Sequence, residues 1–188
     1  MNSASTAERR HLLGTIALGM MASGSALTAG CSQSVSNDRQ LVFATLKDAL
    51  QELTKLPNPA PLPPATALNW AQTLTHCAQS IEFSMTGFPK PKSALFQRTV
   101  GSAAFQVFAW RGRMSHDLAE PIPGAPELDP AQAVADAQAR LRRAVDAFEQ
   151  WTHPLQPHFA YGELSKPQFE QAHAMHLAQH LSAFHNAA

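Results

Sequence analysis

Three histidines near the C-terminus are spaced so that their imidazoles would share one face of a helix. They are His173, His176 and His180, in the run HAMHLAQH. Residues three and four positions apart are neighbours on a helix surface, and two imidazoles four positions apart can bind the same metal ion. Imidazole is also the commonest metal ligand in proteins. The run therefore predicts part of a divalent-metal site, and packed or surface histidines are the alternative.

The helix that carries these histidines is predicted to begin at Ser165-Lys166-Pro167 and to end near Phe184. Serine is a preferred N-cap, and proline is favoured in the first turn. Phe169 and Leu177 lie on the same stripe as the histidines. We therefore expect the stripe to face a protein core rather than water.

Apolar periodicity and capping residues predict four further helices. They cover residues 38–55, 66–85, 93–110 and 129–151, with Asp38, Thr66 and Asp129-Pro130 at predicted starts. No alternating apolar pattern typical of strands occurs. We predict an all-α fold, a bundle of four main helices with one additional inserted helix.

The segment 93–110 is the inserted helix of this prediction. It is apolar nearly all round, and Arg98 with a few polar side chains argues against a membrane span. We therefore expect this helix to be buried between the others. The connection after it, residues 111–127, is long and rich in proline. Connections of that length in a small domain are often functional.

Composition excludes several classes of protein. Lys+Arg and Asp+Glu are both 14, so there is no net basic excess to attract nucleic acid or anionic lipid. The two cysteines, Cys31 and Cys77, do not form a disulfide framework. The chain also lacks a Gly-rich phosphate loop, a CxxC pair and a Ser/His/Asp order, which removes several enzyme classes.

The N-terminal residues 1–31 are predicted to be an export signal, and residues 32–188 the helical domain. Arg9-Arg10 precede a modestly apolar stretch rich in Gly and Ala, which resembles a twin-arginine signal. A membrane-spanning helix is the alternative. Ala29-Gly30-Cys31 resembles the end of a lipoprotein box, although Thr28 stands where leucine is usual. The protein is therefore expected to be periplasmic or a membrane-anchored lipoprotein, with plain cleavage of the signal as the alternative to lipidation.

Several short motifs together resemble the DinB-like superfamily, in particular its DUF1569 family. The resemblance covers roughly residues 40–185. The matching motifs are LTHCAQSIE at 74–82, FPKPKSALF at 88–96, PGAP at 123–126, PHFAYG at 157–162, and the pair His176-x-x-x-His180 followed by Phe184.

The resemblance implies a four-helix bundle that binds a divalent ion through one histidine of the second helix and an HxxxH pair of the last. In this chain these residues are His76, His176 and His180. His173 would be an outer neighbour, with the alternative that it completes the ligand set from one turn before His176. Zn, Ni and Fe all accept imidazole ligands. On a helical wheel, however, His76 lies far from the apolar stripe of its helix, so it would face water unless the 93–110 helix covers that stripe.

Three functions remain open. The first is an exported metal-dependent enzyme acting on a small molecule, such as a thiol-linked transferase or a hydrolase, because some DinB-like relatives are thiol transferases. The second is a non-catalytic metal- or ligand-binding module, and the third is a domain whose metal site has decayed. The oligomeric state also stays open, a homodimer included. Accessory residues considered for the enzyme are Gln79, Glu82, His116, His158 and Tyr161.

The export prediction depends on Arg9 and Arg10. Replacing both with lysine should strand the precursor in the cytoplasm without affecting folding, because the arginines serve recognition and belong to no predicted core helix. Fractionation of cells that express each form measures this. Unchanged export of the lysine form would rule out the twin-arginine route.

Overall fold

The computed structural model describes residues 39–57, 59–61 and 67–187. The chain divides after Cys31 into two units, Met1–Cys31 and Ser32–Ala188. The predicted export signal with its lipoprotein box, and the predicted helix starts Asp38 and Thr66, lie outside the described residues. In the part of the chain that is described, no helix combines the length and apolar character that crossing a bilayer requires.

The first helix, α1 (Leu46–Thr54), begins later than predicted. Thr45 caps it, because its side chain accepts a hydrogen bond from the Asp48 backbone N–H while Asp48 bonds back to the Thr45 N–H. Before this capping box the chain is not helical and lies against the end of the last helix. The backbone N–H of Arg39 donates to the carbonyl of Ser182 at 3.1 Å.

The second helix, α2 (Trp70–Thr86), ends near the predicted Met85 but begins later than the predicted cap Thr66. Asn69 and Gln72 form a capping box at its start. Gly87 ends the helix with a φ of 108°, a conformation that favours glycine. Almost the whole circumference of α2 is buried, so its polar side chains must find partners within the protein.

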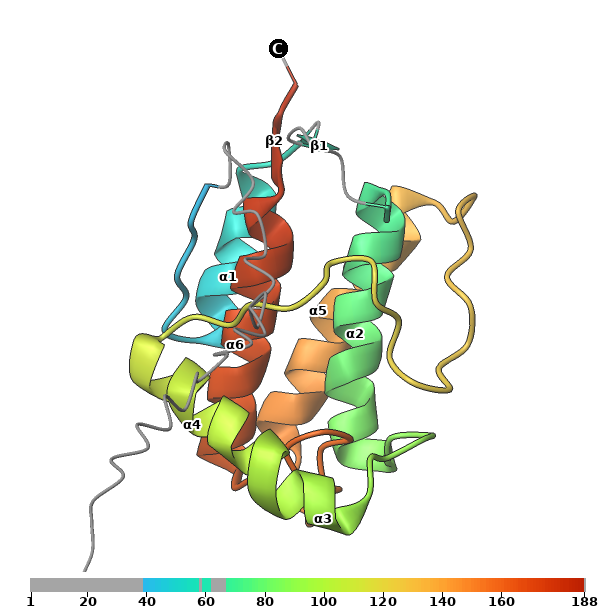
Figure 1. Cartoon of the computed structure of the whole chain (residues 1–188). Helices are drawn as coiled ribbons and strands as arrows, with labels where there is room; N and C mark the ends of the chain where they lie inside the picture. The colour runs from blue at the N-terminus through green and yellow to red at the C-terminus, as the bar shows by residue number, and fades with distance from the viewer. Residues whose placement is uncertain (1–38, 58, 62–66, 188) are drawn as a thin grey trace, which may run out of the picture. The chain divides into compact units, whose positions relative to one another are not determined.

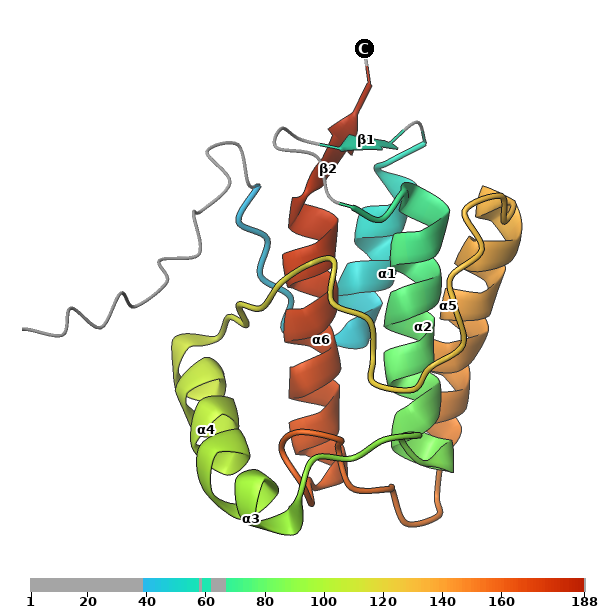
Figure 2. The same ribbon diagram turned by 45° about the vertical axis from the view of Figure 1, so that its right-hand side comes forward.

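Residues 94–111 form a continuous helical segment made of α3 (Ala94–Phe96), the π-helix η1 (Gln97–Gly101) and α4 (Ser102–Arg111). Figures 1 and 2 show this segment outside the other helices, with α4 beside α6. Within α4, Phe105 is the one side chain that is buried. The prediction that this segment is buried between other helices is therefore wrong. The apolar stripe of α2 already packs in the core with α5 and α6, which leaves no place for it there.

The last two helices differ in how well their starts were predicted. α5 (Val134–Gln150) begins five residues after the predicted Asp129, because the Asp129 carboxylate accepts from the Ala131 N–H within a turn. α6 (Lys166–Ser182) begins as predicted, with Ser165 and Gln168 forming a capping box.

A small antiparallel sheet joins β1 (Pro59–Pro61) to β2 (Phe184–Asn186), with Ala60 opposite His185. The expectation of a chain without strands is therefore wrong at these two places. Three-residue strands are too short to display an alternating apolar pattern, and proline is compatible with strands at a sheet edge.

The core lies where α1, α2, α5 and α6 meet (Figure 2). α2 packs against both α5 and α6, and α1 packs against α6. The largest fully buried side chains of this core include Leu74, Ile81, Leu141, Phe148 and Phe169. The prediction of a mainly helical fold is confirmed.

Gly101 joins η1 to α4 where the helix touches the 153–165 loop. Its backbone is helical, with a φ of −64°, so alanine would suit the local conformation. A Cβ there would, however, lie 1.8 Å from the carbonyl oxygen of Ala160. We expect Gly101→Ala to lower the free energy of unfolding by about 1–3 kcal/mol in chemical denaturation. Ala103→Ser, on the exposed face of the same helix, is the control. Equal stability of the two variants would contradict the close contact.

Candidate metal centre

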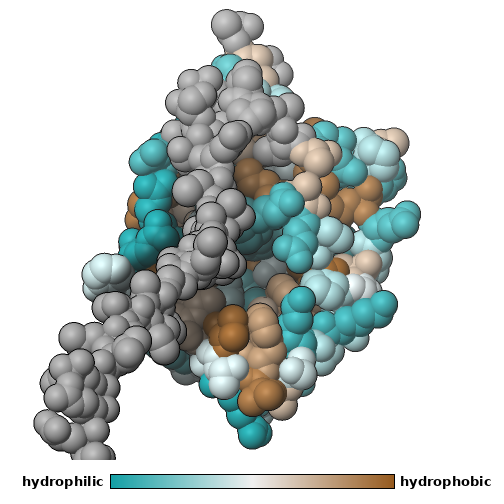
Figure 3. Space-filling model, in the orientation of Figure 1, coloured by the Kyte–Doolittle hydropathy of each residue, from teal (hydrophilic) through white to brown (hydrophobic). Residues whose placement is uncertain are grey.

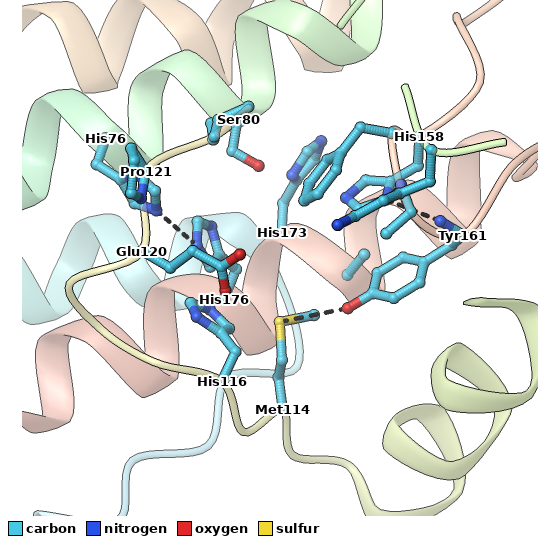
Figure 4. A pocket seen from close by; sticks show the side chains of 15 residues that line it. His76, Ser80, Met114, His116, Glu120, Pro121, His158, Tyr161, His173 and His176 are labelled. Carbon is cyan, nitrogen blue, oxygen red and sulfur yellow. Dashed lines mark hydrogen bonds between the residues drawn. The ribbon is translucent and has the colours of Figure 1, made fainter. Parts of the chain in front are cut away.

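The three histidines implied by the family resemblance lie together in the structure. His76 comes from α2, and His176 and His180 come from successive turns of α6. Each offers a ring nitrogen, and these three atoms all lie within 4.8 Å of one another. The Nε2 atoms of His76 and His176 are 3.2 Å apart (Figure 4). This arrangement can hold a metal ion.

His76 faces α6 rather than water, and its side chain is only 2% exposed. The 112–133 loop covers the side of α2 that carries His76. The sequence offered a different way to bury His76, with the 93–110 helix covering the apolar stripe on the opposite side of α2. Gln79 donates its Nε2–H to the carbonyl of Pro126 at 3.1 Å, and Gln72 donates to that of Leu128 at 3.0 Å. The polar stripe of α2 therefore anchors a loop, and His76 lies beneath it.

Burial keeps the three imidazoles neutral. Loss of solvation lowers the pKa of His76 from 6.5 to about 4. Loss of solvation is the larger cause, and repulsion from the neighbouring imidazoles the smaller cause, that holds the pKa values of His176 and His180 well below 6.5. At neutral pH each ring therefore has an unprotonated nitrogen, the form that binds metal.

The unpartnered nitrogen of His180 supports a cation at this place. Among the described residues, the buried Nδ1 of His76 and the buried Nε2 of His180 have no hydrogen-bond partner. Leaving a buried polar atom unpaired costs about 1–3 kcal/mol. A divalent ion would satisfy the His180 nitrogen together with the facing Nε2 atoms of His76 and His176, so the residues fit such an ion.

His116 is a fourth imidazole beside the cluster, and the 112–133 loop brings it there. Its ring centroid lies 5.2 Å from that of His176 and 5.3 Å from that of His180. Its Nδ1–H donates to the Asp117 carbonyl at 2.9 Å, and Gln179 of α6 donates to the His116 carbonyl at 2.6 Å. The second bond fixes the loop to α6, and the first leaves Nε2 of His116 as an unprotonated acceptor.

His173 does not belong to the cluster. Its ring packs against Phe148 and Phe169, at centroid distances of 5.3 and 5.6 Å. Burial lowers its pKa to about 3. It is thus a buried neighbour one turn away from His176.

A cavity of about 280 Å³ reaches the cluster. His76 and His176 form one end of it, and His158 and Tyr161 form the other (Figure 4). Further lining residues, mostly from the 112–133 loop, are Ser80, Met114, His116, Glu120, Pro121 and Ile122. The imidazoles are therefore accessible from a space that can hold a small molecule.

The far end of the cavity has a defined hydrogen-bonding character. The rings of His158 and Tyr161 stack at 4.2 Å with an angle of 8° between them. The Nδ1 of His158 accepts from the backbone N–H groups of Ala160 and Tyr161. Since burial also lowers the pKa of His158 to about 3, the ring is neutral, and Nε2 carries its proton as a donor.

Three residues that the sequence singled out have structural roles. Glu82 forms a two-pronged ion pair with Arg140 of α5, at 2.7 and 3.0 Å. Gln79 holds the loop, as described above. Cys77 is completely buried in the core, and burial raises the pKa of its thiol, so it offers no reactive thiolate.

The comparison with known families places most of the chain in one family. Residues 35–187 match the family described as proteins of unknown function, DUF1569. The chain belongs to this family. No curated protein and no solved structure matched it.

The metal-free protein should lose stability in mild acid. Between pH 6.5 and about 4 the unfolded chain protonates histidines such as His76 that stay neutral when folded. The unfolded state then binds more protons, so the free energy of unfolding falls as pH falls, by about 1.4 kcal/mol per pH unit for each such histidine. Denaturation curves with chelator present measure this. A free energy of unfolding that stays constant from pH 7 to pH 5 would contradict the burial of neutral imidazoles.

Proposed function

We propose that this protein binds a divalent metal ion through His76, His176 and His180 and acts on a small molecule in the adjoining cavity. One observation carries the proposal: a buried cluster of three neutral imidazoles is reached by a cavity on one side. Sites that serve only structure are usually closed by four protein ligands, whereas catalytic sites keep a position open. When bound, the ion would supply Lewis acidity to a group of the small molecule.

The cavity walls suit a molecule with a polar end and an apolar body. His158 offers an N–H donor at the end distant from the triad, and Phe159 and Tyr161 offer aromatic surface. Tyr161 is held in place by its stacking on His158 and by its hydroxyl, which donates to the sulfur of Met114 at 3.9 Å. Lys92 and Glu120 add one charge of each sign to the lining.

Within this proposal the reaction is a transfer or a hydrolysis, and a thiol-linked transfer is the form suggested by the DinB-like resemblance. The thiol would have to come from a second small molecule, because Cys77 is buried in the core. The same resemblance would make α1, α2, α5 and α6 a DinB-like four-helix bundle. Zn, Ni and Fe are all suitable ions for three imidazoles.

A non-catalytic metal- or ligand-binding module is the second candidate, and His116 favours it. The ring of His116 lies against His176 and His180 with Nε2 as an acceptor. A small movement of the loop would add it as a fourth ligand and close the site.

Export remains part of both proposals. Arg9-Arg10 and the segment ending at Cys31 suggest a twin-arginine signal with a lipoprotein box. The protein would then act in the periplasm or as a lipid-anchored protein. Folding before export would allow the metal to be bound in the cytoplasm.

Metal content of the untagged protein tests the site. His76→Ala, His176→Ala and His180→Ala should each lose most of the ion after dialysis, as measured by elemental analysis. The double change at His176 and His180 should be little worse than either single change, because residues that share one site are not additive. Bound metal should also raise the melting temperature, since only the native state binds it.

The controls are His153→Ala and His185→Ala, because both side chains are exposed and neither belongs to the histidine cluster. They should keep the ion. His116→Ala distinguishes the two candidates, because an open site keeps its metal in this variant and a site closed by four ligands binds it much more weakly. Full occupancy in His76→Ala would show that α2 takes no part.

A further inference from the structure

The helical segment 94–111 exposes an unusual amount of apolar surface. Leu95, Val100, Val107 and Trp110 are 74, 60, 49 and 86% exposed. Of the large apolar side chains that are exposed in the described part of the chain, only Val42 and Val134 lie elsewhere. A gathering of exposed apolar side chains on one element marks a contact surface for a partner or a membrane.

The two hydroxyl groups on this segment add little to its hydration. The Thr99 hydroxyl donates to the Leu95 carbonyl at 2.7 Å, and the Ser102 hydroxyl donates to the Arg98 carbonyl at 3.1 Å. Both hydroxyls are therefore paired with the backbone of their own helix. Figure 3, drawn in the orientation of Figure 1, shows apolar surface in the lower half of the view, where α3 and α4 lie.

The charge of the same region has one sign. No acidic residue occurs between Glu82 and Asp117, whereas Lys90, Lys92, Arg98 and Arg111 all do. Within the described residues, none of these four cations forms an ion pair. The chain as a whole is neutral, so this region is a local basic patch beside an apolar face.

We propose that the outer face of residues 94–111 binds the surface of an anionic lipid bilayer. Helices that lie in a bilayer interface combine apolar and aromatic side chains on one side with lysine and arginine beside them. Trp110 is the side chain suited to the level of the lipid headgroups. The cations match anionic phosphates, whereas a protein partner would have to offer both acidic and apolar groups in the same pattern.

The placement also affects the proposed site. α4 packs on α6, which carries two of the three histidines. Gly101 touches Ala160, next to His158 and Tyr161 of the cavity. A bilayer on the outer face of α4 would therefore lie one helix away from the cavity.

Vesicle binding by the full chain tests the proposal. Vesicles made of equal parts of phosphatidylglycerol and phosphatidylcholine should bind the protein more tightly than vesicles of phosphatidylcholine alone. The double variant Val107→Ser/Trp110→Ser should bind at least about tenfold more weakly, because two apolar side chains no longer leave water. Arg98→Gln and Arg111→Gln should each weaken binding to the anionic vesicles about fivefold.

The matched control is Val42→Ser/Val134→Ser, which removes exposed apolar side chains elsewhere and should bind as the parent does. In a Trp151→Phe background two tryptophans remain, and Trp70 is buried in the core whereas Trp110 is exposed. A shift of the emission to shorter wavelength with anionic vesicles, and its quenching by brominated lipid, would therefore come from Trp110. This signal reports α4 itself, whatever the N-terminal segment does. Equal binding by all variants, or an unshifted Trp110 spectrum, would overturn the proposal. The proposal would also be overturned if the parent sediments as a dimer and Val107→Ser/Trp110→Ser sediments as a monomer, because the face would then be a protein interface.

Discussion

The burial of neutral imidazoles where α2 meets α6 is the constraint on which the rest of this structure depends. His76, His176 and His180 occupy a place where a tightly packed protein would ordinarily put apolar side chains. Each ring has hydrogen-bonding atoms that lose water there, and those atoms must be paired or bind a cation. A capping box fixes the start of each of the two helices, and packing in the shared apolar core holds α2 against α6.

The 112–133 loop follows from the same constraint. α2 is buried on nearly all sides but carries a polar stripe, and water cannot satisfy a stripe that lies inside the protein. Backbone carbonyls of the loop accept from Gln72 and Gln79 instead. By covering the stripe, the loop also brings His116 to the histidines and forms one wall of the cavity. The long proline-rich connection is therefore a part of the site.

The outer helical segment shows why totals of composition mislead. Equal numbers of acidic and basic residues argued against attraction to anionic lipid. Net charge is a sum over the whole surface, while a membrane or a partner contacts only one part of it. In the sequence, no acidic residue occurs between Glu82 and Asp117, a stretch that includes α4. The same segment is apolar on both sides, and because the core is already filled, one side stays exposed.

The sequence by itself determined the local features of this protein. The start of α6, the end of α2, the neighbouring positions of His176 and His180, and the mainly helical fold all depend on spacing and capping within a few residues. The family resemblance added His76, whose helical-wheel position argued for water. Only the tertiary structure decided that His76 is buried, that residues 94–111 lie outside, that His116 joins the cluster, and that Pro59–Pro61 pairs with Phe184–Asn186. These outcomes depend on which helix faces pack in the core and on contacts between residues far apart in the chain. A local sequence pattern contains information on neither.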